Sequence, residues 1–199
     1  MSHNAGYFNQ LFDNSDDPWA FRLRWYEARK RALTLACLPA LRYASGYEPG
    51  CANGELSAAL AARCDRLLVS DGSARAVELT RARVFDLPHV QVRQAWLPAE
   101  WPADTFDLIV ISELGYFLGH EALDGLAAKA RASLRTGGTL LACHWRWPIQ
   151  GGALDGDAVH RRLTQQLDLP LLSQVQELDF RLDVWSEDAR SVAQREGFV

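Results

Sequence analysis

The sequence predicts an α/β fold in which helices cover both faces of a mostly parallel β-sheet. Short apolar runs alternate with helical patterns from residue 43 onward, which is typical of βα units. Residues 107–111 are apolar on both faces, as expected for a strand that is buried on both sides. Residues 171–185 alternate apolar and polar side chains over their second half, so we expect one or two antiparallel edge strands there.

The predicted elements begin with an N-terminal helix. Asp17 and Pro18 indicate its start, because Asp accepts free backbone N–H groups and Pro suits the first helical position. We expect this helix to end near residues 38–39 and to pack an apolar stripe on the core. The stripe consists of Phe21, Trp25, Ala28, Ala32 and Leu35. The later strands are predicted at 43–48, 67–71, 90–93, 106–112 and 139–144, and the helices at 56–62, 74–84, 123–134 and 158–167.

Composition indicates one folded, soluble domain. The chain has 199 residues, 48% of them hydrophobic and 23% charged, with a formal net charge of -4. This charge gives no basic footprint for nucleic acid. Asp13, Asp16 and Asp17 stand where a secretory leader needs basic residues, and no apolar run reaches the roughly 18 residues that span a bilayer. We therefore expect a cytoplasmic protein without nucleic-acid or membrane partners.

The four cysteines do not predict a metal site. Cys37, Cys51, Cys64 and Cys143 form no C-x-x-C pair and have no histidine at zinc-ligand spacing. We expect free thiols in a reducing compartment and no bound metal.

The turn after the first predicted strand is the expected ligand site, because open α/β sheets bind ligands at the carboxyl ends of their strands. Gly50 and Gly54 allow a tight turn and a close approach of a ligand. Ala52 and Glu55 break the dinucleotide fingerprint G-x-G-x-x-G, and the G-K-[ST] of a phosphate-binding loop is missing. Glu48 at the entrance of the turn suits a ligand that carries positive charge.

Asp71 ends the second predicted strand. Its carboxylate is able to accept hydrogen bonds from both hydroxyls of a ribose, although a lone Asp at this place is also a common helix cap. Together, Glu48 and Asp71 in this order favour a nucleoside ligand with a cationic group.

These residues resemble the class I S-adenosylmethionine-dependent methyltransferases, whose first motif E/D-x-G-x-x-x-G is followed by an acid that closes the second strand. Within that class the chain is most similar to the nodulation-type N-methyltransferases. The matching segments are Asp17-Pro18-Trp19-x-Phe21, Tyr26-Glu27-x-x-Lys30, His144-Trp145-Arg146 and Phe180-Arg181-Leu182-Asp183-Val184-Trp185. Ala52, where the class usually has glycine, and Pro49 depart from the pattern.

The resemblance implies a single-domain Rossmann-like core over residues 41–199, a helical lid over residues 1–40, and S-adenosylmethionine as the cofactor. It assigns the methionine side, the ribose, the adenine region and the lid to particular positions. These are Glu48, Gly50, Cys51 and Gly54 for methionine; Asp71, Gly72 and Ser73 for the adenosine; Ala95, Trp96 and Leu97 for adenine; Ser112 beside donor and acceptor; and Trp19, Tyr26 and Lys30 for the lid. Trp96 has the alternative of a plain core aromatic.

Methyl transfer is an in-line displacement, so alignment of the reactants is the protein's main task. No covalent nucleophile is needed. An amine acceptor must be neutral to attack, and a carboxylate or imidazole that takes its proton would assist. Glu113, Tyr116 and His144 are the catalytic candidates, because all three lie at or just beyond the ends of predicted strands. Glu113 is favoured, whereas a strand-end histidine such as His144 is often purely structural.

For the acceptor, the resemblance implies N-methylation of a small amine such as an amino sugar. The D/N-P-P-Y/F motif of enzymes that methylate nucleic-acid bases is missing, since Ser112-Glu113-Leu114-Gly115 stands there. The alternatives are an O-methyltransferase for a small hydroxylated metabolite, a non-catalytic S-adenosylmethionine-binding regulator, and a nicotinamide-dependent oxidoreductase.

Overall fold

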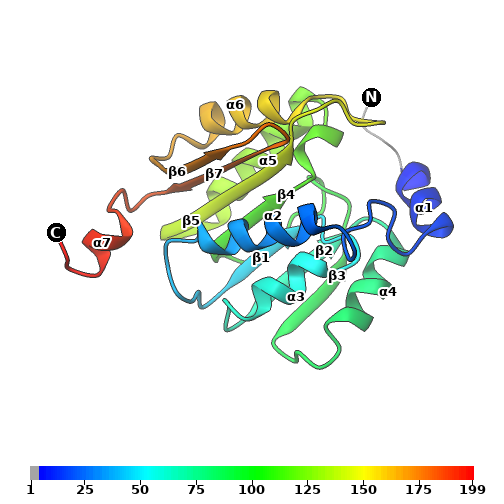
Figure 1. Cartoon of the computed structure of the whole chain (residues 1–199), viewed down its shortest axis with the longest axis horizontal. Helices are drawn as coiled ribbons and strands as arrows, with labels where there is room; N and C mark the ends of the chain where they lie inside the picture. Colours follow the sequence, from blue (N-terminus) through cyan, green and yellow to red (C-terminus); the bar gives the residue numbers. More distant parts are fainter. Residues whose placement is uncertain (1–4) are drawn as a thin grey trace.

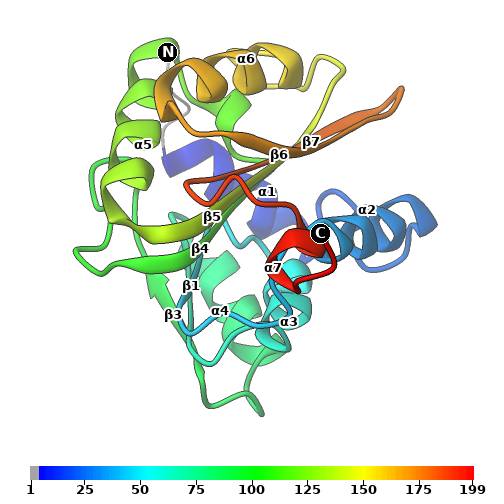
Figure 2. The ribbon, with the colours of Figure 1, turned by 90° about the vertical axis from the view of Figure 1, so that its left-hand side faces the viewer.

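The computed structural model describes residues 5–199, which form one mixed sheet with helices on both faces (Figures 1 and 2). The strand order is β3-β2-β1-β4-β5-β7-β6. Strands β1 to β5 are parallel to one another, while β7 pairs antiparallel with both β5 and β6. The predicted fold class, with its antiparallel C-terminal edge, is confirmed.

Strands and helices alternate along most of the chain. The strands are β1 Gly46–Pro49, β2 Leu67–Asp71, β3 Val90–Gln94, β4 Phe106–Ser112, β5 Leu134–Trp145, β6 Leu171–Gln176 and β7 Phe180–Ser186. The helices are α1 Ala5–Asn14, α2 Trp25–Ala36, α3 Glu55–Ala61, α4 Ala74–Arg83, the 3-10 turn η1 Gly115–Phe117, α5 His120–Ser133, α6 Gly156–Leu167 and α7 Val192–Arg195. Helices α1 and α7 were not among the predicted elements.

Strand β4 lies at the centre of the sheet and contributes to two hydrophobic cores. Ile109 and Ile111 pack in the core that includes α5 and α6. Leu108 and Val110 pack in the core on the opposite face, with side chains of α3 and β7. Burial on both faces is what the continuous apolar run of this strand predicts. The strand order reverses between β1 and β4, which creates the place for a ligand site at their carboxyl ends.

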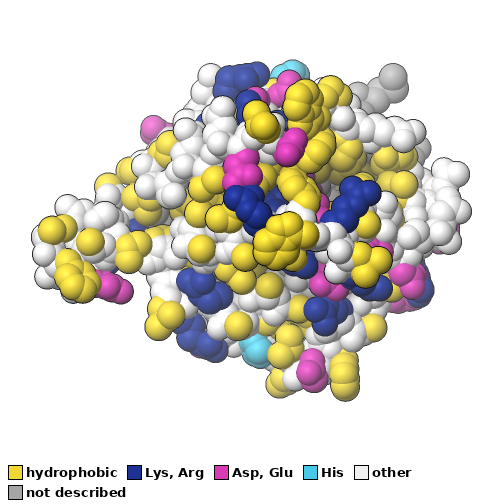
Figure 3. Space-filling view, viewed as in Figure 1, with side chains coloured by type: hydrophobic (Ala, Val, Ile, Leu, Met, Phe, Trp, Pro, Cys, Tyr) yellow, Lys and Arg dark blue, Asp and Glu magenta, His cyan; other side chains and the backbone are white. Residues whose placement is uncertain are grey.

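The predicted N-terminal helix is wrong in its start and in its buried face. Helix α2 begins at Trp25, because the carboxylate of Asp17 accepts hydrogen bonds from the N–H groups of Phe21 and Arg22 and closes a turn ahead of the helix. Trp25, expected in the core, is 77% exposed. Hydrophobic side chains accordingly appear on the surface over α2, with basic side chains beside them (Figure 3).

The buried side chains of α2 are Glu27, Lys30 and Thr34. Leu35 of the predicted stripe does pack against the core, together with Tyr26 and Leu33. The stripe failed at Trp25 because the most deeply buried face of this helix covers a partly polar cavity. Along residues 5–199, no helix has the length and apolar character needed to cross a membrane.

Candidate active site

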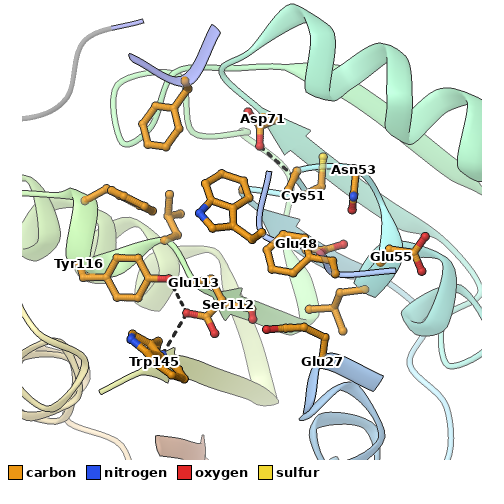
Figure 4. Close-up of a pocket in the computed structure, with 18 of the residues that line it drawn as sticks. Glu27, Glu48, Cys51, Asn53, Glu55, Asp71, Ser112, Glu113, Tyr116 and Trp145 are labelled. Carbon is orange, nitrogen blue, oxygen red and sulfur yellow. Dashed lines mark hydrogen bonds between the residues drawn. The ribbon is translucent and has the colours of Figure 1, made fainter. Parts of the chain in front are cut away.

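A cavity of about 670 Å³ lies at the carboxyl ends of β1, β2 and β4 and is covered by the N-terminal helices (Figure 4). Most of the residues predicted from the sequence line it. They are Trp19, Tyr26, Lys30, Glu48, Gly50, Cys51, Asp71, Gly72, Ala95, Trp96, Leu97, Ser112, Glu113 and Tyr116. Gly54, Ser73 and His144 are not brought into the wall.

Glu48 is the most deeply buried acid of the cavity, at 2% exposure. The hydroxyl of Ser57 donates a hydrogen bond of 2.6 Å to its Oε2, and no ion pair to Glu48 forms within the described residues. Burial raises the pKa of Glu48 to about 8, and the nearby charge of Asp71 contributes to that rise. This carboxyl group is therefore suited to a ligand that brings positive charge.

Asp71 faces the same cavity from the neighbouring strand, so the two acids lie on one side of the molecule as the sequence interpretation requires. The N–H of Ala52 donates to Oδ2 of Asp71 (3.0 Å), and the N–H of Ser73 donates to Oδ1 (2.9 Å). Burial raises the pKa of Asp71 to about 6, although these N–H groups act to lower it. The carboxylate keeps acceptor capacity for a ligand, because its two oxygens together offer about four lone-pair sites.

The glycines of the first turn have different tasks. Gly50 lines the cavity at φ +78°, in the left-handed region that glycine adopts without strain. Gly54 lies behind the wall at φ +80°, where a Cβ would come within 3.1 Å of the Thr80 backbone. Ala52 accepts a left-handed φ of 49°, and its carbonyl receives a hydrogen bond from Thr80 Oγ1. Ala52 thus fits the loop in place of glycine.

The residues of the predicted adenine region line the cavity, and two of their backbone N–H groups already donate hydrogen bonds within the protein. The N–H of Ala95 donates to the carbonyl of Asp71, and the N–H of Trp96 donates to Glu100 Oε2 (2.6 Å). The Trp96 ring covers Gly72, where a Cβ would lie only 2.5 Å from the ring. Ser73 caps α4 by accepting from the N–H of Ala76, which explains why it is buried outside the cavity.

Glu113 is surrounded by hydrogen-bond donors. Lys30 Nζ contacts its Oε1, the Tyr116 hydroxyl contacts its Oε2, and the N–H of Trp145 donates to Oε2 at 3.0 Å (Figure 4). Burial lowers the pKa of Lys30, but Glu113 and Glu27 outweigh it and raise that pKa above its ordinary value. Burial and the charge of Glu113 raise the pKa of Tyr116. Lys30 therefore stays charged and Tyr116 stays protonated, so both hold Glu113 in place.

His144 is fully buried behind the cavity. Its Nε2 lies 3.0 Å from the N–H of Gly115, and its Nδ1 lies 3.1 Å from Nε2 of His160. Both ring nitrogens are engaged, so His144 has no free lone pair for an acceptor. This position and these hydrogen bonds do not support His144 as the base.

Sequence reasoning missed two buried polar residues of the wall. Glu27 is buried and contacts Lys30 Nζ at 3.0 Å. Asn53 is 1% exposed; its Nδ2 donates to Asp17 Oδ1, whereas its Oδ1 finds no partner within the described residues. The spacing of Glu27 and Lys30, three residues apart on one helix face, was the available signal for the first.

The sheet is that of the class I S-adenosylmethionine-dependent methyltransferases, and the cavity lies at the carboxyl ends of its strands, where that class of fold binds ligands. The family described as nodulation protein S (NodS) matches residues 8–146, well over half of the chain. The chain belongs to the NodS family. The family predicted from the sequence is confirmed.

The curated relatives match only part of the chain. Nodulation protein S of Rhizobium tropici is 33% identical over 106 residues, which are 53% of this chain and 44% of that protein. The chain spans about half the length of the curated relatives it matches.

Two solved structures cover most of this chain. A putative methyltransferase from Pseudomonas syringae is 54% identical over 82% of this chain and 99% of that one, with a TM-score of 0.74. The N-methyltransferase NodS from Bradyrhizobium japonicum WM9, in complex with S-adenosyl-L-homocysteine, is 24% identical over 92% and 98%, with a TM-score of 0.82.

Proposed function

We propose that this protein transfers a methyl group from S-adenosylmethionine to the nitrogen of a small amine, with an amino sugar as the preferred acceptor. The observation that carries the proposal is the single cavity wall that presents Glu48 and Asp71 on adjacent strands. The relationship to NodS N-methyltransferases supports nitrogen as the target atom. An O-methyltransferase for a small hydroxylated metabolite is the alternative.

The residues of the wall fit this cofactor. Glu48 is a buried acid without a cationic partner in the described part of the chain, and it suits a sulfonium. Asp71 retains acceptor capacity for the ribose hydroxyls, and Ala95, Trp96 and Leu97 offer apolar contact for adenine. The unpartnered Oδ1 of Asn53 is an acceptor that a ligand donor would satisfy. S-adenosylmethionine would supply an electrophilic methyl group at this place.

The acceptor side carries more negative than positive charge. Two carboxylates, Glu27 and Glu113, contact the ammonium of Lys30. Over the whole wall the acids outnumber the bases, since Glu27, Glu48, Glu55, Asp71, Glu113 and Asp179 stand beside Arg24, Lys30 and Arg31. Such a site favours an amine that enters as an ammonium ion over a neutral alcohol. Burial raises the pKa of Glu27, so its carboxyl group is our candidate to take the proton that the amine must lose. Glu113 and Tyr116 would then orient the acceptor.

We also assign residues 1–40 to a lid and 41–199 to the catalytic core. In support, Phe8, Phe12 and Trp19 close the cavity from the N-terminal side, where they would exclude water from the reaction. The four thiols are free, which suits the cytoplasmic location that we assign to the protein.

Two measurements test the proposal. Calorimetry compares S-adenosylmethionine with NAD, and tight binding of NAD alone would reject it. Labelled S-adenosylmethionine is then incubated with amino sugars, polyamines and alcohols matched in size. We expect label on amines; label on alcohols alone would favour the O-methyltransferase, and cofactor binding without any transfer would favour a regulator.

A further inference from the structure

Three fully buried side chains form a continuous line from the active-site turn to the antiparallel strand β7. His144 lies on β5, His160 on α6 and Asp183 on β7, and each has 0% exposure. The N–H of Gly115 lies 3.0 Å from Nε2 of His144, whose Nδ1 lies 3.1 Å from Nε2 of His160. Nδ1 of His160 lies 2.8 Å from Oδ2 of Asp183.

The first link fixes the direction of the whole line. A backbone N–H only donates, so Nε2 of His144 must accept and the ring proton must sit on Nδ1. That proton is donated to Nε2 of His160, and the proton of His160 is therefore also on Nδ1 and is donated to Asp183. Burial is the main cause that lowers the pKa of both histidines, which keeps the rings neutral as the line requires.

Asp183 is a strong terminal acceptor. Besides His160, the Nε of Arg181 donates to its Oδ2 at 2.8 Å, and Nε2 of Gln174 donates to its Oδ1 at 2.9 Å. These donors hold the pKa of Asp183 below its usual value, although burial acts to raise it. The carboxylate is thus fixed as an anion at the far end of the line.

The near end of the line holds the turn that carries Tyr116. Gly115 begins η1, and a Cβ there would lie 2.5 Å from Val159 and 3.0 Å from Nε2 of His144. Tyr116 follows directly and donates to Glu113. Since Trp145, the neighbour of His144, also donates to Glu113, β5 fixes this carboxylate both directly and through the turn.

We propose that His144 and His160 are positioning residues, whose hydrogen bonds connect the fixed carboxylate of Asp183 to the Gly115–Phe117 turn. By fixing this turn, they keep the Tyr116 hydroxyl hydrogen-bonded to Glu113 at the acceptor side. This inference rests on the proposed methyl transfer. It assigns a task to His144 and to the 180–185 segment, which the cofactor site leaves without one.

The test compares two variants at His160. Glutamine presents one carbonyl acceptor and one N–H donor, so His160→Gln preserves both links, whereas His160→Met removes them. We expect His160→Met to lower kcat at least tenfold while the affinity for S-adenosylmethionine stays within twofold, and His160→Gln to retain most of the activity. His120→Met, at an exposed position on α5, is the matched control. An unchanged kcat in folded His160→Met, or a parallel loss of cofactor affinity, would overturn the proposal.

A second measurement needs no turnover. Nitrogen-15 NMR of the histidines in the unmodified protein should show both His144 and His160 as Nδ1–H tautomers. The hydroxyl proton of Tyr116 should shift in His160→Met and return toward its original position in His160→Gln. An Nε2–H tautomer at either histidine would refute the line of hydrogen bonds, even if no acceptor is methylated. If methyl transfer fails while the tautomers and the Tyr116 shift appear as expected, the proposed function falls and the positioning line stands.

Discussion

Three carboxyl groups of the cavity have different hydrogen-bond partners, and these partners indicate different roles. Glu48 is buried against a hydroxyl, Asp71 against two backbone N–H groups, and Glu113 against a lysine, a tyrosine and a backbone N–H. Only Glu113 has a full cationic partner. Glu48 and Asp71 therefore remain available to a cationic or hydroxyl-bearing ligand, while Glu113 serves to hold the geometry of the acceptor side.

Replacing Asp71 with Ala should weaken S-adenosylmethionine binding by about ten- to 150-fold, or about 1.5 to 3 kcal/mol, because hydrogen bonds to a charged acceptor are lost. The structure adds that the N–H groups of Ala52 and Ser73 would lose their acceptor as well. Calorimetry of Asp71→Ala beside Asp86→Ala, an exposed aspartate, measures the effect. Equal affinities of the two variants would refute the ribose assignment.

Glu48 predicts a pH dependence of cofactor binding. Its pKa of about 8 means that the empty protein holds a proton there at neutral pH, and a cationic ligand requires the ionised form. Affinity for S-adenosylmethionine should therefore rise on the order of tenfold between pH 6.5 and 8, with proton release on binding. Calorimetry in buffers of different ionisation enthalpy detects that release. Glu48→Gln should abolish the dependence, and the exposed Glu78→Gln should retain it.

The same raised pKa destabilises the empty fold as pH rises. The folded protein binds a proton on Glu48 more tightly than the unfolded chain, so the stability from this group is complete below pH 4.5 and is lost as pH rises through about 8. Chemical denaturation of the unmodified protein should therefore show a loss of stability across this window that is smaller in Glu48→Gln. An identical pH profile of the two proteins would contradict the raised pKa.

At the scale of elements, α2 buries polar side chains because it covers the cavity. Its buried side chains include an acid and a lysine, and Lys30 Nζ lies 5.1 Å from the centre of the Tyr26 ring. Lys30 joins Glu27 of the same helix to Glu113 at the end of β4. The helix is therefore fastened to the sheet by charge as well as by apolar contact.

Removal of that charge should be costly. Lys30→Met leaves two buried carboxylates without their cation, and loss of one partner of a buried ion pair typically costs about 3 to 5 kcal/mol. We expect a loss of unfolding free energy of this order by urea denaturation. The double variant Lys30→Met/Glu113→Gln should recover part of it. Lys129→Met, the exposed second lysine, should change stability by less than about 1 kcal/mol, and an equal effect of both lysine variants would contradict the expectation.

The elements also show what local sequence patterns reveal. Strands β2 and β4 were predicted with their observed ends, because apolar runs between turn residues define them locally. Glu48 and Asp71 line one cavity because parallel strands end at one edge. By contrast, the contact of Lys30 with Glu113 joins residues 83 positions apart, and no periodicity encodes it. The burial of His144 depends likewise on α6 and β7, which fold over it from later in the chain.

At the scale of the whole molecule, the N-terminal segment is tied to the core by apolar packing, with Phe8 and Trp19 against the core that includes α5, and also by polar contacts. Asp16 forms an ion pair of 2.8 Å with Arg75 of α4, and Asp17 accepts from Asn53 of the first turn. Arg29 makes a two-fold contact with Glu177 in the hairpin between β6 and β7. Exposed ion pairs contribute only about 0 to 1 kcal/mol each. These exposed ion pairs therefore add little to the attachment, and the apolar contacts carry most of it.

The proposed lid predicts which residues S-adenosylmethionine protects from amide exchange. If residues 5–24 are the lid that we propose, saturation with S-adenosylmethionine should slow their amide exchange more than that of α5, which contributes no residue to the cavity wall. A ligand concentration of about 100 times the dissociation constant should stabilise the whole fold by about 2.7 kcal/mol. The protection of residues 5–24 must therefore exceed the protection that this general stabilisation gives to the rest of the chain. Asp17→Ala should loosen residues 15–24 before ligand is added, because the side-chain contacts to Asn53 and to the N–H groups of Phe21 and Arg22 are lost, whereas the exposed Asp13→Ala should not. Hydrogen–deuterium exchange measured by mass spectrometry reports all three, and protection of residues 48–54 without any change over 5–24 would show that the N-terminal segment does not close over the cofactor.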